Sequence, residues 1–310
     1  MPARGEAVIG MGVACLDQLL LWNDMGAPVR EARIVDRQAQ GGGMAATAMV
    51  AVSRLGGQAE LWAAVGTDWV GDLILRELEN ERVDTSQAAR LDGKGSLLVT
   101  VSVDQPTGER HFVHSTGQHH ADTAVGDLAR LESAGCLLID HGLPGAEARA
   151  AQRARELGVP VVTDTEGLGE RNRAVFAHVD YAVLSRDCAQ TLDAGGDWRE
   201  AGRRVQDLGP GCVVVTLGDG GLACLDGDEY EEVPAFPVDV VDTTGAGDVF
   251  HGAFCFGLTQ GYPLHDNLVF ASAVAALKCR RLGGRSGIPS LEEVFDFLGE
   301  RGATPPTSDI

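Results

Sequence analysis

Short apolar runs alternate along this chain with longer stretches whose apolar residues recur every three or four positions. The short runs are predicted to be buried strands, because they have strand length and are rich in β-branched residues. They are Ala7–Val13, Leu61–Val65, Cys136–Asp140, Val159–Asp164, Tyr181–Leu184 and Cys212–Leu217. The longer stretches are predicted to be helices. They include Met44–Leu55, Trp69–Glu81, Glu147–Leu157 and Trp198–Leu208. The alternation predicts an α/β protein with a doubly wound, mostly parallel sheet that is flanked by helices on both faces.

Two segments depart from this alternation and are typical of antiparallel hairpins. Ser96–Ser102 and Arg110–Ser115 flank a Pro-Thr-Gly-Glu turn, and Leu222–Val233 contains an Asp-Gly-Asp turn. We expect the first hairpin to join Arg33–Gln40 in a small β-sheet outside the main one. The chain is therefore predicted to form one domain over residues 1–310. Two lid segments are inserted into it, at about 14–40 and 94–118.

Composition narrows the class of protein. The chain has 310 residues, 44% of them hydrophobic, which is typical of a packed globular protein. The formal net charge of −20 disfavours a nucleic-acid partner and an anionic membrane surface. No apolar run reaches the ~20 residues that span a bilayer, and the N-terminus lacks the pattern of a signal peptide. Seven scattered cysteines without a C-x-x-C pair favour free thiols in a reducing compartment. We therefore expect a cytoplasmic protein.

The Gly-rich stretch from Asp242 to Asp248 is the most informative about chemistry. An apolar run ends at Val241, the residues Asp-Thr-Thr-Gly-Ala-Gly-Asp follow, and a helix rich in Ala, Phe and Leu begins. Backbone N–H groups at a helix N-terminus bind anions, and glycines let an anion approach closely. Asp248 could simply cap the helix. A carboxylate at an anion site also suits a base that accepts the proton of a hydroxyl attacking a phosphoryl group.

The string Asp242-Thr-Thr-Gly-Ala-Gly-Asp-Val-Phe250 resembles the signature of the ribokinase (PfkB) family of sugar kinases, and the resemblance covers roughly Val8 to Ile288. It implies a ribokinase-like fold in which the sugar lies between the lid and the sheet. It also implies ATP and Mg²⁺ as cofactors and in-line transfer of the γ-phosphoryl group. The implied catalytic residues are Asp248, as the base, and Gly245, Ala246 and Gly247, whose backbone forms the anion hole with that of Asp248.

Two N-terminal stretches extend the resemblance to the sugar site. Gly41–Thr47 and the V-G-x-D-x-x-G run Val65–Gly71 look like the N-terminal signature of the family, in which a di-glycine contacts the sugar. Where the family often has asparagine, this chain has Thr47, so that hydrogen bond to the sugar is changed or lost. Asp17 matches the family's ligand for sugar hydroxyls, although it could be a plain strand-end carboxylate. The implied substrate-binding residues are Asp17, Gly42, Gly43, Thr47 and Asp248.

Val215–Gly221 matches the T-x-G-x-x-G nucleotide loop of the family, although its glycines also suit an ordinary hairpin turn. The implied nucleotide-binding residues are Thr216, Gly218, Gly221, Thr243, Gly245, Gly247 and Ser272. The resemblance further implies a monovalent-cation site, for K⁺. Its residues are Asp242, Thr244, Lys278, Arg281, Gly283 and Gly287, the last four through their backbone.

One segment departs from the family pattern. Many members carry an N-x-x-E that helps to hold Mg²⁺ and the phosphates. The expected place, after the strand that ends at Leu184, is Ser185-Arg186-Asp187-Cys188, where both residues are absent. Asp187 and Glu166 are candidate replacements that would act through water.

The substrate and the class of protein leave several hypotheses open. The C-terminal third looks most like ketose kinases (fructokinase, ketohexokinase and sulfofructose kinase), which favours a neutral ketose or related sugar. An anionic sugar would need fixed basic groups, for which Arg30, Arg33 and Arg110 in the lid segments are candidates. A nucleoside kinase is the alternative within the family, and a non-catalytic sugar- or nucleotide-binding regulator is the alternative on the same fold. Lid sheets in the family often pair across a dimer, so we expect a homodimer.

A different enzyme class is suggested by the stretch Gly10–Cys15, which half resembles a dinucleotide-binding fingerprint. Its third glycine is replaced by Cys15, and no acidic residue follows at the expected distance. A strand-end turn is the better interpretation. An oxidoreductase dependent on a nicotinamide cofactor is the competing hypothesis.

Overall fold

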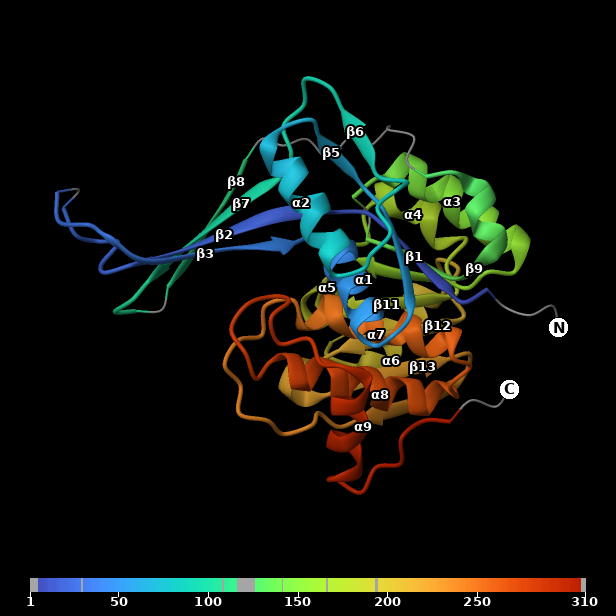
Figure 1. The fold of residues 1–310 in the computed structure, drawn as a ribbon. Helices are drawn as coiled ribbons and strands as arrows, with labels where there is room; N and C mark the ends of the chain where they lie inside the picture. Colours follow the sequence, from blue (N-terminus) through green and yellow to red (C-terminus); the bar gives the residue numbers. More distant parts are fainter. Residues whose placement is uncertain are drawn as a thin grey trace.

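A computed structural model describes residues 5–28, 30–107, 109–115, 126–140, 142–165, 167–192 and 195–307. These residues contain one large sheet with helices on both faces (Figure 1). The strand order is β14-β13-β12-β11-β10-β9-β1-β4. The strands are β1 (Ala7–Met11), β4 (Gln58–Trp62), β9 (Ala134–Ile139), β10 (Val161–Thr165), β11 (Tyr181–Ser185), β12 (Cys212–Thr216), β13 (Leu222–Asp226) and β14 (Glu229–Val233). Only the β13 and β14 pairings are antiparallel among these strands. The predicted fold class is therefore confirmed.

Each face of the large sheet has its own hydrophobic core. Cys136 and Leu138 of β9 lie in one core, and Leu137 and Ile139 lie in the other. The strands are apolar throughout because both of their faces are buried. The first core is covered by α1 (Met44–Arg54), α2 (Trp69–Asn80), α7 (Ala246–Thr259), α8 (Leu264–Lys278) and α9 (Leu291–Gly299). The second is covered by α3 (Pro144–Leu157), α4 (Glu170–Phe176), α5 (Arg186–Gln190) and α6 (Trp198–Gln206).

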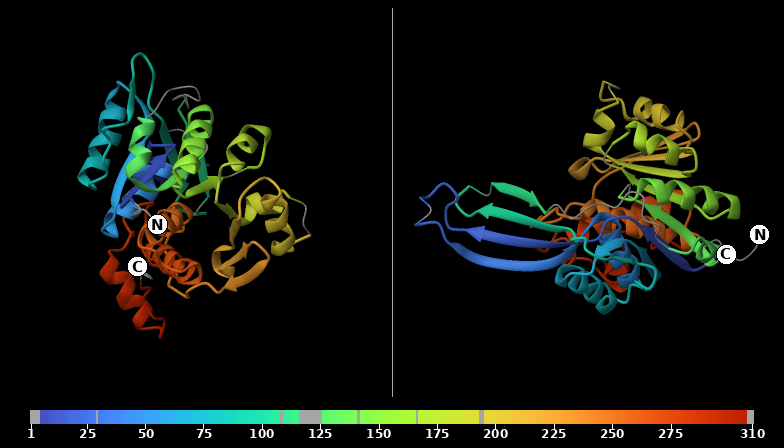
Figure 2. Two further views of the ribbon diagram at one scale, coloured as in Figure 1. Left: turned by 90° about the vertical axis from the view of Figure 1, so that its right-hand side faces the viewer. Right: turned by 90° about the horizontal axis from the view of Figure 1, so that it is seen from above.

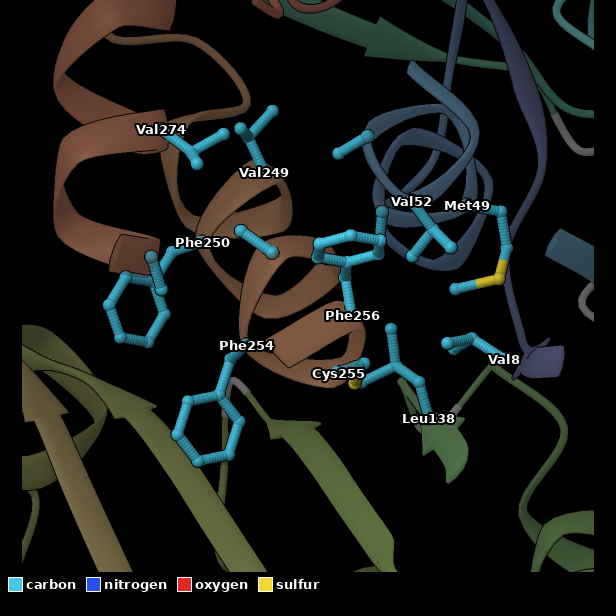
Figure 3. Close-up of a cluster of buried hydrophobic side chains, with 14 of the residues drawn as sticks. Val8, Met49, Val52, Leu138, Val249, Phe250, Phe254, Cys255, Phe256 and Val274 are labelled. Carbon is cyan, nitrogen blue, oxygen red and sulfur yellow. The ribbon is translucent and has the colours of Figure 1, made fainter. Parts of the chain in front are cut away.

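Helix α7 is the central element of the first core. Figure 3 shows Phe256 of α7 beside Val52 of α1, while Phe254 points toward the sheet. Where α7 crosses α1, a Cβ on Gly252 would lie 2.2 Å from Ala48 O, so glycine permits this close packing. This close packing fixes the start of α7, which carries Asp248, over the central strands of the sheet.

A second, four-stranded sheet extends away from the body of the molecule (Figure 2). Its order is β3-β2-β7-β8, from β2 (Cys15–Trp22), β3 (Ile34–Gly42), β7 (Leu98–Asp104) and β8 (Arg110–His114). The predicted hairpin is β7 and β8, and Arg33–Gln40 corresponds to β3. Strand β2 was not predicted, because its sequence, Cys-Leu-Asp-Gln-Leu-Leu-Leu-Trp, does not alternate; it pairs antiparallel with β3 and parallel with β7. We call these four strands the lid sheet.

The prediction of one strand at Leu61–Val65 was wrong. The chain leaves the large sheet after Trp62, and Ala64–Gly66 forms β5, which pairs with β6 (Ala89–Leu91) in a separate two-stranded sheet. The break lies at Ala63, whose carbonyl oxygen accepts a hydrogen bond from Ala89 N at 2.8 Å. An apolar run shows no break of this kind, because Trp62, Ala63 and Val65 are all buried.

Two further expectations concern the cysteines and the membrane. All seven cysteines are buried thiols. Among the helices of the described residues, none combines the length and the apolar character that crossing a bilayer requires.

Candidate active site

The turn from Asp242 to Asp248 leads into the N-terminus of α7, which has no side-chain cap. Gly245 is the N-cap residue, and its φ of 73° lies in the left-handed region that favours glycine. Thr243, which is exposed, accepts a 3.1 Å hydrogen bond at its carbonyl oxygen from Ala246 N. The space over the Cα atom of Gly247 is open. The first N–H groups of an α-helix have no acceptor within the helix. The turn can therefore direct N–H groups and the helix dipole at an anion.

Asp248 lies in the first turn of α7 without capping it. Burial, reinforced by the negative charge of Asp164, raises the pKa of Asp248 to about 7. The charges of His251 and Arg285 act in the opposite direction. A carboxyl group with this pKa can give up or accept a proton near neutral pH, which suits a general base. The capping role considered from the sequence is therefore not the role of this side chain.

His251 and Asp164 form a pair that the sequence analysis missed. His251 is 4% exposed, and its Nδ1 lies 2.7 Å from Gly247 O and 3.4 Å from Asp164 Oδ2. Burial lowers the pKa of His251 and so favours the neutral imidazole, while the negative charge of Asp248 acts in the opposite direction. The position of Asp164 at the end of a predicted strand was a usable signal, because ligands of open α/β sheets bind at the carboxyl ends of strands.

Asp17 of β2 lies against the glycines at the end of β3. A Cβ on Gly42 would lie 2.3 Å from Asp17 Oδ2, so any side chain there would displace the carboxylate. Gly43 is the N-cap of α1 with a φ of 93°, and a Cβ there would lie 2.4 Å from Val13 O. Burial raises the pKa of Asp17, whose Oδ1 accepts a 3.3 Å hydrogen bond from Cys15 Sγ. Three of the residues implied for the sugar, Asp17, Gly42 and Gly43, are therefore brought together.

Arg285 is a buried cation on this side of the site that the sequence analysis did not single out. It is 6% exposed, and it donates from Nη2 to Gly42 O at 2.8 Å and from Nε to Thr47 Oγ1 at 3.2 Å. Burial lowers the pKa of Arg285, while acidic neighbours such as Glu77 and Asp17 raise it. Thr47, only 2% exposed, is thus bonded to a buried guanidinium, which holds it behind the di-glycine.

Asp140 at the end of β9 ties three segments together. Its Oδ2 accepts hydrogen bonds from Val13 N at 2.7 Å and Ala45 N at 2.9 Å, and its Oδ1 accepts one from Gly142 N at 2.9 Å. A Cβ on Gly12 would lie 1.8 Å from Asp140 Oδ1. The close approach of this carboxylate therefore explains why residue 12 is glycine. It agrees with the interpretation of Gly10–Cys15 as a turn at the end of a strand.

The predicted nucleotide loop follows β12. Thr216 Oγ1 donates a 3.2 Å hydrogen bond to Leu184 O, which joins the ends of two parallel strands. Gly218 and Gly221 have φ values of 62° and 85°, both in the left-handed region. Ser272 is half-buried on α8, which packs against α7.

The segment that departs from the family pattern has structural roles of its own. Ser185 caps α5 with its hydroxyl group. Arg186 donates a hydrogen bond from Nη2 to Leu217 O in the nucleotide loop. Asp187 is exposed, and Glu166 lies outside the described residues. The two signature positions are thus Ser185, which caps α5, and Cys188, which is buried, so neither supplies a carboxylate.

Asp242 is the centre of the predicted cation site. Its Oδ1 accepts hydrogen bonds from Thr244 N at 3.0 Å and Thr244 Oγ1 at 2.7 Å, and its Oδ2 accepts one from Gly283 N at 2.8 Å. Burial alone would raise the pKa of Asp242, but the hydrogen bonds from these two amides hold it below its usual range. Asp242 therefore stays ionised and joins the Gly-rich turn to the segment after α8.

Lys278 has a side-chain contact in addition to the backbone role implied for it. The side chain is fully buried and donates from Nζ to Asp242 O at 2.9 Å. A Cβ on Gly287 would lie 2.2 Å from Lys278 O, so this carbonyl group packs against the glycine. Arg281 is exposed.

A cavity of about 210 Å³ lies between the lid sheet and the Asp242 turn. Its polar lining includes Asp17, Gln40, Asp242 and Thr244, and its apolar wall comes from β2 and β7 of the lid sheet. Asp17, which is implied for the sugar, therefore faces a common space under the lid sheet with Asp242 and Thr244 of the predicted cation site.

Comparison with known proteins agrees with this geometry. Residues 13–291 match the family described as pfkB family carbohydrate kinase. The ATP-dependent ribose-1-phosphate kinase of Halopiger xanaduensis is 32% identical over 279 residues, covering 87% of this chain and 90% of its own. The nucleoside kinase of Methanothermobacter thermautotrophicus is 25% identical over 311 residues, covering 96% and 98%. The solved structure of ribokinase from Thermotoga maritima superposes with a TM-score of 0.83 at 25% identity, covering 95% and 99%.

Proposed function

This chain belongs to the pfkB family of carbohydrate kinases, and on that basis we propose that it transfers the γ-phosphoryl group of ATP to a hydroxyl group of a sugar or nucleoside. One observation carries this proposal. The carboxylate of Asp248 lies in the first turn of a helix whose N-terminus has no side-chain cap, and its pKa is raised to about 7. A base and an anion site are therefore combined within one helical turn.

Each part of the site has a role in this mechanism. Asp248 accepts the proton of the attacking hydroxyl group. The backbone N–H groups of Gly245 to Asp248 stabilise the charge on the transferring phosphoryl group. Asp17 accepts hydrogen bonds from other sugar hydroxyls, and the lid sheet excludes water that would otherwise compete as the acceptor.

Mg²⁺ fits the carboxylates that are present. Mg²⁺ keeps several waters and is commonly bound by one or two carboxylates together with substrate phosphates. Within the described residues, no three His, Cys, Asp or Glu side chains converge as a metal cage. Asp164, half-buried at the end of β10, is close enough to Asp248 to raise its pKa. We therefore assign Asp164 to hold the ion, which when bound would neutralise charge on the phosphates.

The sugar that we propose is ribose or a close ribose derivative. The compared relatives are named as ribose-1-phosphate, nucleoside and ribose kinases, so each acts on a ribose-type unit. The ketose preference inferred from the sequence has no support from these three. A neutral ring is favoured because Arg33 Nη1 donates to Arg30 O and Ala32 O, at 2.8 and 3.2 Å. The side chain of Arg110 lies outside the described residues.

A direct assay tests this function. ADP release from Mg²⁺ and ATP would be measured with ribose, ribose 1-phosphate, fructose, sulfofructose and adenosine. We expect the highest kcat/KM for ribose, which is the free, neutral sugar of the ribose type in this set. Preference for fructose would restore the ketose hypothesis, and preference for adenosine would favour the nucleoside kinase. ATP binding with no release of ADP for any acceptor would favour a non-catalytic regulator.

The pH dependence of the reaction follows from Asp248. A base is active when deprotonated, so activity is lost as the pH falls below its raised pKa of about 7. We expect kcat/KM to fall about tenfold between pH 8 and pH 6, as for one group titrating near 7. Initial rates in saturating Mg²⁺ and ATP would measure it. A flat profile over this range would contradict the assignment, and the residual activity of Asp248→Asn should lack the slope.

We also propose that the chain forms a homodimer through the lid sheet. Its two edge strands expose apolar side chains, with exposed fractions of 46% for Ile34, 50% for Val35 and 62% for Val113. Exposed apolar strands at a sheet edge are typical of association surfaces. Light scattering should give twice the chain mass of 32.5 kDa, and Val35→Lys combined with Val113→Lys should give the mass of one chain. A wild-type monomer at micromolar concentration would exclude the dimer.

A further inference from the structure

The side chain of Lys278 is the starting observation. The chain contains two lysines, Lys94 on an exposed turn and Lys278 at the end of α8. Lys278 is 0% exposed. An ammonium group is strongly hydrated in water, so complete burial is costly unless acceptors compensate it. The buried position of Lys278 indicates that its positive charge has a role at the groups that it contacts.

The ammonium group lies at the Gly-rich turn. Lys278 Nζ donates to Asp242 O at 2.9 Å, and Asp242 N donates to Cys279 O at 3.1 Å. Gly283 N donates to Asp242 Oδ2 at 2.8 Å. The turn is therefore joined to α8 and to the segment after α8 through one residue, Asp242. An added Cβ on Gly245 would lie 3.0 Å from Gly284 O, so this segment also supports the anion hole itself.

A monovalent cation does not fit this arrangement. A K⁺ ion at the Asp242 carboxylate would lie beside a buried ammonium of the same charge that is bonded to Asp242 O, and like charges repel strongly at low dielectric. Both carboxylate oxygens of Asp242 already accept hydrogen bonds, from Thr244 and from Gly283 N. The residues that the family resemblance assigned to K⁺ thus carry a covalently attached cation in its place.

We propose that Lys278 is a tethered substitute for the monovalent cation, so that this kinase reaches full turnover without K⁺. The inference rests on the proposed phosphoryl transfer and specifies its activation. Lys278 is a positioning residue: its charge orders the turn from Asp242 to Gly245 and thereby places the amides of the anion hole. Its charge is present at every K⁺ concentration, whereas a bound ion would dissociate.

The first test compares cations at constant ionic strength. Turnover and the Kd of Mg²⁺ and ATP would be measured for the wild-type protein in KCl, NaCl and tetramethylammonium chloride. We expect both quantities to agree within about twofold in the three salts. Activation by K⁺ of tenfold or more, or ATP binding tightened tenfold by K⁺, would overturn the proposal. The Kd distinguishes this inference from the kinase function, because it is measured without turnover.

The second test uses Lys278→Ala, which removes the charge and leaves space for an ion. We expect at least tenfold weaker ATP binding and slower turnover in tetramethylammonium chloride, with partial recovery in KCl or NH₄Cl. A purely structural lysine would give a loss that all salts leave unchanged, and that result would overturn the proposal. If this variant fails to fold, Lys278→Ser, which also removes the charge and leaves space for an ion, is measured in its place and should show the same loss and partial recovery. Lys94→Ala, an exposed control, should match the wild-type protein in every salt.

Discussion

Asp248→Asn is expected to lower kcat by about 10²- to 10⁴-fold, the usual contribution of a positioned general base. Asparagine keeps the shape of the side chain but cannot accept the proton of the sugar hydroxyl. The fold should be unaffected, because Asp248 does not cap α7 and its ionised form is disfavoured by burial. ATP should still bind, since the anion hole consists of backbone amides. Steady-state kinetics and calorimetric titration with ATP would measure the two effects.

The matched control is Asp228→Asn, an exposed aspartate whose side chain is 99% accessible. It should leave kcat within about twofold of the wild-type value. Near-normal turnover of Asp248→Asn would remove Asp248 as the base. Lost ATP binding in that variant would instead mean that the carboxylate shapes the nucleotide site.

Asp140→Ala is expected to lower the free energy of unfolding by about 3–5 kcal/mol, because three backbone N–H groups lose their acceptor and each such loss costs about 1–3 kcal/mol. Some of this is offset because a buried carboxylate no longer has to be desolvated. Without the carboxylate, the segment after β1, the start of α1 and the segment after β9 would no longer be held to one another. Urea unfolding followed by circular dichroism would measure the change.

Two variants make this second prediction sharper. Asp140→Asn retains one acceptor oxygen and should fall between the alanine variant and the wild-type protein. Asp228→Ala, on the exposed turn, should change the unfolding free energy by less than about 0.5 kcal/mol. A loss below 1 kcal/mol for Asp140→Ala would mean that water replaces the carboxylate at all three amides.

Local pattern determined most of the fold and the reacting end of the site. Strands that are buried on both faces are continuous apolar runs. The order of strands and helices, and with it the doubly wound sheet, could therefore be predicted from the sequence. The Gly-rich turn ahead of an apolar helix could also be predicted, because helix capping and left-handed glycines are properties of the local sequence. The exceptions, β2 and the break at Ala63, are places where an apolar run gives no sign of which sheet it joins.

The tertiary structure alone decided which distant side chains meet at that turn. Asp140, Asp164 and Arg285 lie more than 100, 80 and 30 residues from Asp248, yet their charges add to the effect of burial on its pKa because the carboxyl ends of parallel strands converge. Lys278 is the clearest case. Its sequence position implied a backbone ligand, but the packing of α8 against α7 directs its ammonium group to Asp242. A local pattern fixes the direction of a side chain relative to its own helix, but it does not fix which other element that helix packs against.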